Sequence, residues 1–190
     1  MVNTALLGAA VHPSLAPWVL AGAVAPDLPI ITLYLYAKLR LKLPTERIWA
    51  EVYPRKGWIS VIHAAHAFPL ATCGLAACAL LGAAPGVAFF ASVALHAAAD
   101  FPIHGEDAHR HLWPLSDWRF VSPLSYWDVR RHARVVAAIE LLLVYACSAF
   151  LWVRGASLPA RGALAAVALW YAVHYARHFL RAPAAQKQGS

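Results

Sequence analysis

The sequence predicts an all-α fold: an integral membrane helical bundle with about five transmembrane segments. Hydrophobic residues make up 61% of the 190 residues and charged residues 13%, whereas soluble domains contain about 45–50% and about 25% respectively. The apolar residues gather in segments whose length approaches the roughly 20 residues that a helix needs to cross a bilayer. We therefore expect one membrane-embedded domain over residues 1–181, followed by a flexible polar tail over residues 182–190.

Five apolar segments follow one another along the chain, at residues 15–37, 58–82, 85–100, 135–153 and 158–176. In the first segment Pro26 and Pro29 flank Asp27, and each proline removes a backbone donor, so we expect a kink there. Glycine and proline between residues 82 and 86, and again between 154 and 159, predict tight turns. The second and third segments, and likewise the fourth and fifth, should therefore form antiparallel hairpins.

The basic residues between these segments predict the orientation in the membrane. With five crossings, the loops at residues 38–56 and 110–134 lie on the same side as the end of the chain and carry most of the lysines and arginines. The opposite side has only Arg154 and Arg161. Because loops rich in Lys and Arg stay in the cytoplasm, the C-terminus is expected there and the N-terminus outside. No basic residue precedes Lys38, which argues against a cleaved signal peptide.

Charge and cysteine content argue against two other classes of protein. The formal net charge is +7, but the basic residues are spread between apolar segments, so no nucleic-acid partner is expected. Cys73, Cys78 and Cys147 lie inside apolar segments without CxxC spacing. They fit neither a disulfide framework nor a cysteine zinc site, and are best explained as small packing residues.

Histidine and aspartate recur at helical spacing at one end of the second and third segments. His96 and Asp100 are four residues apart and therefore share a helix face. His63 and His66 enter the neighbouring segment from the same side, so a hairpin brings all four side chains together. Ionisable groups are rare inside membranes and usually serve a function. The pattern predicts a metal site, although a histidine hydrogen-bonded to an aspartate would have the same spacing.

Three further residues have two interpretations each. Asp27 is either a fifth ligand brought in by the kinked first helix or an interfacial carboxylate at a helix start. His132, at the start of the fourth segment, either completes the metal site or lies among lipid headgroups beside Arg130 and Arg131. Glu140, about two turns deeper in the bilayer, is either a general base or a protonated packing carboxyl.

Aromatic residues accompany the remaining histidines. His109 and His111 lie in a loop rich in tryptophan, and His174 and His178 lie near Trp170 in the last segment. Because tryptophan and tyrosine favour the membrane interface, we interpret both regions mainly as interface anchors.

Five short motifs carry a resemblance to a known family. They are APDLP at residues 25–29, HAAHA at 63–67, LHAAAD at 95–100, LWPLSDWRF at 112–120 and SYWD at 125–128. Over residues 18–132 the chain resembles the bacterial inner-membrane family of membrane-bound metal-dependent hydrolases, and the last two motifs are the most specific. The resemblance implies a multi-pass protein of the bacterial inner membrane.

The resemblance also implies a set of metal ligands. In that family the aspartate after proline, the paired histidines and the HxxxD motif resemble the ligands of zinc-dependent phospholipase C and related nucleases. On this resemblance the metal ligands are Asp27, His63, His66, His96 and Asp100, with His104 or His111 and His132 as further ligands. The implied cofactor is a divalent metal, first zinc and otherwise manganese or iron.

The expected reaction is hydrolysis of a phosphodiester or another lipid-linked substrate at the membrane interface. A metal ion would polarise the substrate and lower the pKa of bound water towards about 7. Asp27 or Glu140 could then take a proton, and Arg119, Arg130 and Arg131 could attract a phosphate. Membrane lipid is therefore the expected partner and a phospholipid the expected class of substrate.

Two other classes of membrane protein compete with the hydrolase. A haem or electron-transfer protein would use His63 or His66 with His96 or His174 as axial ligands, but haem iron has no use for the nearby carboxylates. A metal transporter would have polar groups in both halves of the bundle, and the outer half is nearly bare. We therefore rank the hydrolase above the haem protein, and rank a transporter level with a non-catalytic scaffold.

Overall fold

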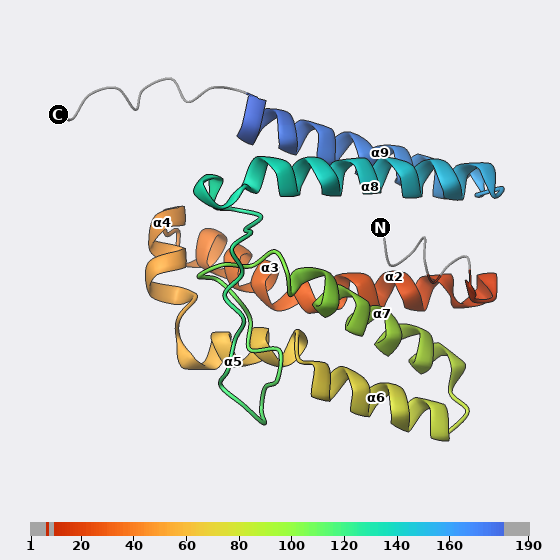
Figure 1. Ribbon diagram of the computed structural model, residues 1–190, viewed down its shortest axis with the longest axis horizontal. Helices are drawn as coiled ribbons and strands as arrows, with labels where there is room; N and C mark the ends of the chain where they lie inside the picture. Colours follow the sequence, from red (N-terminus) through yellow and green to blue (C-terminus); the bar gives the residue numbers. More distant parts are fainter. Residues whose placement is uncertain (1–6, 8–9, 181–190) are drawn as a thin grey trace.

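The computed structural model describes residue 7 and residues 10–180. Within this part of the chain every regular element is helical and there is no strand, which confirms the predicted all-α fold. The longer helices run roughly along the long axis of the molecule (Figure 1). The predicted tail, residues 182–190, lies outside the described residues.

The first apolar segment is a bent helical rod. It consists of η1 (Pro13–Leu15), α2 (Ala16–Val24), η2 (Ala25–Asp27), α3 (Leu28–Leu35) and η3 (Tyr36–Arg40). The 3₁₀ turn η2 interrupts the α-helix where Pro26 and Pro29 lack amide hydrogens. Asp27 is the last residue of this turn, so the helix breaks at the carboxylate, as predicted.

The second apolar segment forms two helices, α5 (Lys56–Ala65) and α6 (Phe68–Leu80). They meet at a bend of 49°, which we did not predict. Pro69 explains the bend, because it has no amide hydrogen to donate to Ala65. The Phe68 amide donates instead to the backbone oxygen of His111, 2.8 Å away. The bend leaves His66 directly after the last turn of α5.

Residues 41–55, between the first and second apolar segments, pack against both of them. They contain α4 (Thr45–Arg47) and η4 (Ile48–Val52). A hydrophobic core forms here from the buried residues Leu33, Ala37, Ile48, Val52 and Ile62. Burial of a large aliphatic side chain is worth about 1.5–3 kcal/mol. This core therefore holds α5, and with it His63 and His66, against α3.

The third apolar segment is α7 (Ala84–Asp100), which runs antiparallel to α6 and also packs along α2 (Figure 1). Gly82 forms the turn with φ +65°, in the left-handed region that glycine tolerates. A side chain at Gly22 would collide with the carbonyl oxygen of Phe89, so the α2 and α7 backbones are in close contact. Ser92 donates to the carbonyl oxygen of Val19 at 2.7 Å. These contacts hold α7 against the kinked first segment.

The last two segments form a second antiparallel hairpin. Its elements are η5 (Val129–Arg131), α8 (Ala133–Val153), α9 (Leu158–Tyr175) and η6 (Ala176–Leu180). The turn contains Gly155 with φ +88°. Figure 1 shows this pair of helices beside the group formed by α2, α3, α5, α6 and α7. Both predicted hairpins are therefore confirmed.

The described residues contain fewer candidate membrane spans than the five expected. Two helices are long and apolar enough to cross a bilayer, Pro13–Arg40 and Ala133–Val153, and a third is added if the bent pair α5 and α6 counts as one span. Helix α7 is apolar but has only 17 residues. The number of crossings beyond these stays a prediction.

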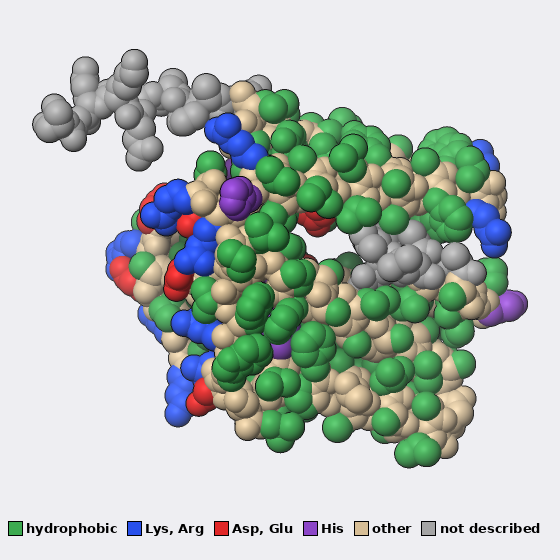
Figure 2. All heavy atoms as spheres, viewed as in Figure 1, with side chains coloured by type: hydrophobic (Ala, Val, Ile, Leu, Met, Phe, Trp, Pro, Cys, Tyr) green, Lys and Arg blue, Asp and Glu red, His purple; other side chains and the backbone are tan. Residues whose placement is uncertain are grey.

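Charged side chains gather at one end of the molecule. Figure 2 shows most of the blue and red atoms at the end that holds α4, the start of α5 and the loop after α7, whereas green atoms cover the sides of the long helices. The basic loops at residues 38–56 and 110–134 therefore lie at the same end of the bundle.

Candidate metal centre

Histidine and aspartate side chains from four elements meet where α7 ends and the loop after it begins. Two overlapping groups have ligand atoms that all lie within 4.8 Å of one another: Asp27, His66 and His96 in one, and His66, Asp100 and His109 in the other. Asp27 comes from η2, His66 from the bend after α5, and His96 and Asp100 from α7. The hairpin and the kinked helix thus bring together four of the predicted ligands.

The distances within these groups suit ligands of one ion. The Oδ2 atom of Asp100 lies 3.2 Å from the Nε2 atom of His96 and 3.4 Å from that of His66. The Oδ1 atom of Asp27 lies 3.7 Å from the Nε2 atom of His96. Two ligands of a tetrahedral zinc ion are separated by about 3.3 Å, since each bond is about 2.0–2.1 Å long. The observed separations cluster around this value.

The backbone fixes the protonation of both helical histidines. The Nδ1 atom of His66 lies 2.9 Å from the carbonyl oxygen of Ile62, and that of His96 lies 2.8 Å from the carbonyl oxygen of Ala23. A carbonyl oxygen only accepts, so Nδ1 carries the hydrogen and Nε2 of the neutral ring has a free lone pair. Both Nε2 atoms are buried without a hydrogen-bond partner. Histidines that bind metals are usually oriented in this way.

His109 belongs to the second ligand group, although the sequence pattern predicted an interface anchor at this position. Its side chain is buried, its Nδ1 atom has no hydrogen-bond partner, and its ring stacks on that of His66 with centroids 3.9 Å apart. Burial lowers the pKa of His109 to about 2, and the charge of His66 acts in the same direction. His109 is therefore neutral and able to bind a metal. Its place among three histidines just after Asp100 was the available signal.

His63 has a different role from its neighbour His66. Its Nδ1 atom accepts a hydrogen bond from the backbone amide of Arg110, 3.3 Å away. Its ring lies 6.2 Å from that of His109, measured between centroids, and it belongs to neither ligand group. His63 thus anchors the loop that carries His109.

His104 forms a pair with a carboxylate that the sequence analysis did not single out. Its Nδ1 atom lies 2.7 Å from the Oδ2 atom of Asp107, whose other oxygen accepts from the amide of Gly105. Burial lowers the pKa of His104, but the hydrogen bond from its ring to Asp107 and the charge of Asp100 outweigh this and raise it. Burial likewise raises the pKa of Asp107, but His104 lowers it overall.

Two other predicted ligands lie outside both groups. His111 is 1% exposed between the rings of Phe68 and Phe101, and neither of its ring nitrogens has a hydrogen-bond partner. Burial lowers its pKa. His132 is exposed in the left-handed turn before α8, with φ 65°. The structure therefore does not bring either ring, or that of His104, into the two groups.

The predicted general base Glu140 lies on α8, outside both ligand groups. Its Oε1 atom accepts a hydrogen bond from the hydroxyl of Tyr171, 3.1 Å away on α9. Its Oε2 atom is buried without a partner. This carboxyl therefore links the two helices of the second hairpin.

The arginines of the loop differ in their partners. Arg130 binds Asp128 through two nitrogens, and Arg131 binds Glu106. Arg119 donates only to the backbone oxygen of Glu106 and, among the described residues, has no carboxylate partner. Of the three arginines expected to attract phosphate, Arg119 is the one whose charge is not paired.

One side of the cluster is open. The exposed fractions of the side chains are 0% for His66, 13% for His96 and 18% for Asp100, but 50% for Asp27. An ion held by the buried residues would therefore be reached past Asp27.

Comparison of the chain with models of known families, with curated proteins and with solved structures returned no match.

Proposed function

We propose that this protein is a membrane-embedded hydrolase that uses a divalent metal ion, in the first place zinc, to cleave a phosphodiester or another lipid-linked substrate at the bilayer interface. The observation that carries the proposal is the convergence of two buried Nε2 atoms on the Asp100 carboxylate, at 3.2 and 3.4 Å. Two lone pairs and a carboxylate repel one another in a buried site unless a cation or a proton lies between them.

The chain itself supplies binding, orientation and a proton acceptor. His66, His96 and Asp100 would hold the ion, with His109 as a fourth ligand. A bound ion would polarise the substrate oxygen and lower the pKa of a bound water. Asp27 lies at the open side of the cluster, so its carboxylate can take a proton from water there. Glu140 is the alternative proton acceptor from the second hairpin.

The surroundings of the cluster favour a lipid-linked anion as substrate. The cluster lies where α7 ends and the loop after it begins, and Figure 2 shows that charged side chains gather towards one end of helices whose sides are apolar. Arg119 has an unpaired charge in the loop beside it, and guanidinium groups bind phosphate well.

The proposal places the chain in the bacterial inner membrane with its N-terminus outside and its C-terminus in the cytoplasm. Helices α7 and α9 would then complete five crossings together with the three candidate spans. Because the charged end carries the basic loops, the positive-inside rule directs this end, and the metal centre with it, to the cytoplasm.

A haem protein fits the cluster less well. An oxygen of Asp100 lies within 3.4 Å of the Nε2 atoms of both helical histidines, in the space that a porphyrin iron between axial ligands would need. A carboxylate there suits zinc or another divalent cation instead.

Metal analysis of the detergent-purified protein tests the proposal. We expect about one or two zinc ions per chain in the wild type and loss of most of the metal in His96→Ala and Asp100→Ala. His178→Ala is the matched control, because this histidine is exposed and lies outside both ligand groups. The proposal would be refuted if the wild-type protein contained no metal and took none up. A Soret absorption band would indicate a haem protein instead.

Activity is tested with the same variants. Bis(p-nitrophenyl) phosphate and mixed micelles of phosphatidylglycerol would be the probes. Hydrolysis should disappear with a chelator, return with zinc, and be absent in Asp100→Ala but not in His178→Ala. Chelator-resistant hydrolysis, or equal rates in Asp100→Ala and the wild type, would contradict a metal-dependent reaction.

A further inference from the structure

The long loop after α7, residues 101–128, is closed by hydrogen bonds between its two ends. The Ser122 amide donates to the carbonyl oxygen of His104 at 3.0 Å, and the Tyr126 amide donates to that of Ile103 at 2.9 Å. The Ser122 hydroxyl also donates to the carbonyl oxygen of Pro102 at 2.6 Å. The second half of the loop, around residues 122–126, thus lies beside residues 102–104, which directly follow α7.

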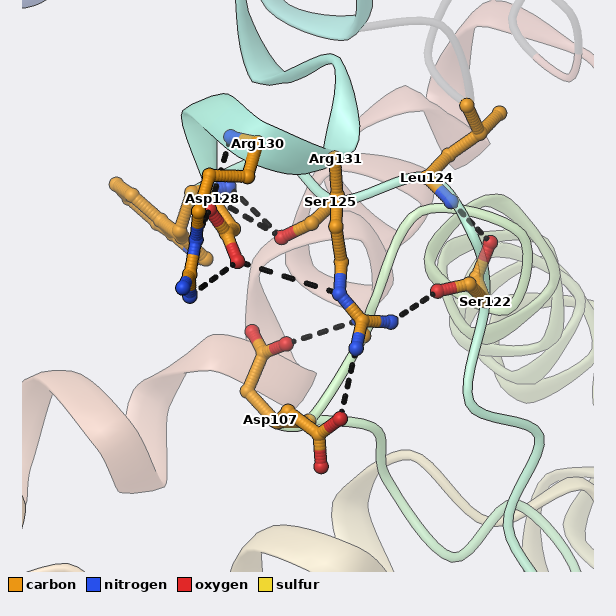
Figure 3. A network of polar contacts seen from close by, with 10 residues as sticks. Asp107, Ser122, Leu124, Ser125, Asp128, Arg130 and Arg131 are labelled. Carbon is orange, nitrogen blue, oxygen red and sulfur yellow. Dashed lines mark hydrogen bonds and ion pairs between the residues drawn. The ribbon is translucent and has the colours of Figure 1, made fainter.

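The side chain of Arg131 also joins these two ends (Figure 3). Its Nη1 atom donates to the carbonyl oxygen of Ser122 at 2.8 Å, and its Nη2 atom donates to the Oε1 atom of Glu106 at 2.7 Å. Its backbone oxygen accepts from the amide of Ser125 at 2.9 Å. The planar guanidinium is suited to this, because its donors point in fixed directions. Arg131 precedes α8, so it also ties the loop to the second hairpin.

The Nε atom of Arg131 also lies 4.0 Å from the Oδ2 atom of Asp128, and its other two side-chain partners lead to His104. Ser122 donates to the backbone oxygen of His104, and Glu106 is next to Asp107, whose carboxylate holds the His104 ring. The His104 ring lies 5.1 Å from that of His109 between centroids. A continuous set of contacts therefore runs from Arg131 to the metal-facing His109.

The environment of Arg131 differs from that of the arginine next to it. The Arg131 side chain is 30% exposed, and that of Arg130 is 90% exposed. A Cβ atom at Gly105 would lie only 3.2 Å from Cδ and Nη1 of Arg131, so the side chain passes directly under the loop. Arg130 pairs with Asp128 alone. It is thus a matched control with the same charge.

We propose that Arg131 is a positioning residue that holds the loop 101–128 against the metal centre and so delivers His109 to the ion. The inference rests on the proposed metal site and adds that one of its ligands depends on an arginine that is not itself a ligand. The helical ligands His66, His96 and Asp100 do not need this support, because α5 and α7 hold them.

The test is a titration of metal-free, detergent-purified full-length protein with Co²⁺, whose visible absorption reports the ligand set. In Arg131→Ala we expect binding to weaken about tenfold to a hundredfold, as for other supporting partners of metal ligands, and the absorption band to change shape. Co²⁺ binding should also weaken in Arg131→Lys, because an ammonium group cannot make both contacts in fixed geometry. Arg130→Ala should resemble the wild type.

Hydrogen exchange of residues 103–110 in the metal-free protein gives an independent measurement. It should be faster in Arg131→Ala than in the wild type or Arg130→Ala, because the loop loses both contacts. Equal exchange, or wild-type Co²⁺ affinity and spectrum in Arg131→Ala, would overturn the positioning role.

Two outcomes separate this inference from the proposed function. If the wild type binds no Co²⁺, the metal site fails, and equal loop exchange in Arg131→Ala would then refute the Arg131 role as well. If Arg131→Ala does not fold, Glu106→Gln decides, since it weakens one contact and keeps the arginine. A weakened, spectrally altered Co²⁺ complex in Glu106→Gln supports the proposal, and an unchanged complex refutes it.

Discussion

At the residue scale, the histidines of the cluster are distinguished by the partner of their second ring nitrogen. His66 and His96 donate from Nδ1 to backbone carbonyl oxygens and keep Nε2 free. His63 uses Nδ1 to accept from the Arg110 amide. His104 donates to Asp107. The same residue type therefore serves as proposed metal ligand, loop anchor or hydrogen-bonded pair, and the partner of Nδ1 distinguishes these roles.

The pair of His104 and Asp107 makes a prediction about pH. The pKa of Asp107 is lowered from its ordinary 3.8, so its contribution is present above pH 3.8 and is lost as the pH falls through the lower folded value. The pKa of His104 is raised from its ordinary 6.5, so its contribution is present below pH 6.5 and is lost as the pH rises through the higher folded value.

We therefore expect Asp107→Asn to destabilise the metal-free protein most between about pH 4 and pH 6.5. The measurement is thermal unfolding in detergent with a chelator across this range, with Asp117→Asn, a more exposed loop aspartate, as control. The effect should be small, because part of the Asp107 side chain is exposed. A difference between wild type and variant that does not vary with pH would contradict the pairing.

At the scale of elements, the site depends on where helices break and how closely they pack. The break at η2 exposes the Ala23 carbonyl oxygen to His96 and places Asp27 beside it. The break after α5 turns His66 towards α7 and frees the Phe68 amide for the loop. Proline causes both breaks by removing a backbone donor. The two helix interruptions thus place Asp27 of the first segment and His66 of the second beside the proposed ion.

The contact of α2 with α7 predicts the effect of a single methyl group. Gly22→Ala would place a Cβ atom against the Phe89 carbonyl oxygen, which forces the helices apart and costs about 1–3 kcal/mol. Because α2 and η2 hold His96 and supply Asp27, zinc content should fall together with the unfolding temperature. The measurement is metal analysis and thermal unfolding of the purified variant.

Gly162→Ala on α9 is the control for this change. A Cβ atom there meets nothing within 4 Å, and alanine is favoured over glycine inside a helix by up to about 1 kcal/mol. This variant should keep its zinc and its stability. Equal zinc content in Gly22→Ala and Gly162→Ala would show that close packing of α2 on α7 does not support the site.

At the scale of the whole molecule, the protein separates a charged end from apolar sides. The basic loops and the Arg131 contacts lie towards that end, whereas the turns of both hairpins lie at the other (Figure 1). Such a distribution suits a membrane protein of the kind proposed, which would act on a substrate at the surface of the bilayer.

This arrangement predicts which positions are accessible from each side of the membrane. In a variant with Cys73, Cys78 and Cys147 replaced by serine, Ser157→Cys should react with an impermeant maleimide in intact cells. Lys56→Cys, at the charged end, should react only after the membrane is opened. Reversed labelling would invert the orientation. Labelling of both positions in intact cells would exclude an odd number of crossings between them, so that at least one of the bent pair, α7 and α8 would not cross.

The sequence by itself determined the local features of this protein. The apolar segments, the kink at Asp27, the two hairpins and the shared helix face of His96 and Asp100 follow from composition, proline chemistry and helical periodicity. These properties depend on residues within a few positions of one another, so spacing was sufficient to predict them. The zinc ligands proposed on α7 belong to this group.

Which distant residues join His96 and Asp100 depends on the tertiary structure. It selected His66 over His63, added His109, left His132 exposed and paired His104 with Asp107. These outcomes depend on an unpredicted bend at Pro69 and on how a 28-residue loop, 101–128, folds back onto α7. Loop closure is set by non-local hydrogen bonds such as those of Arg131, and no periodicity along the chain encodes them.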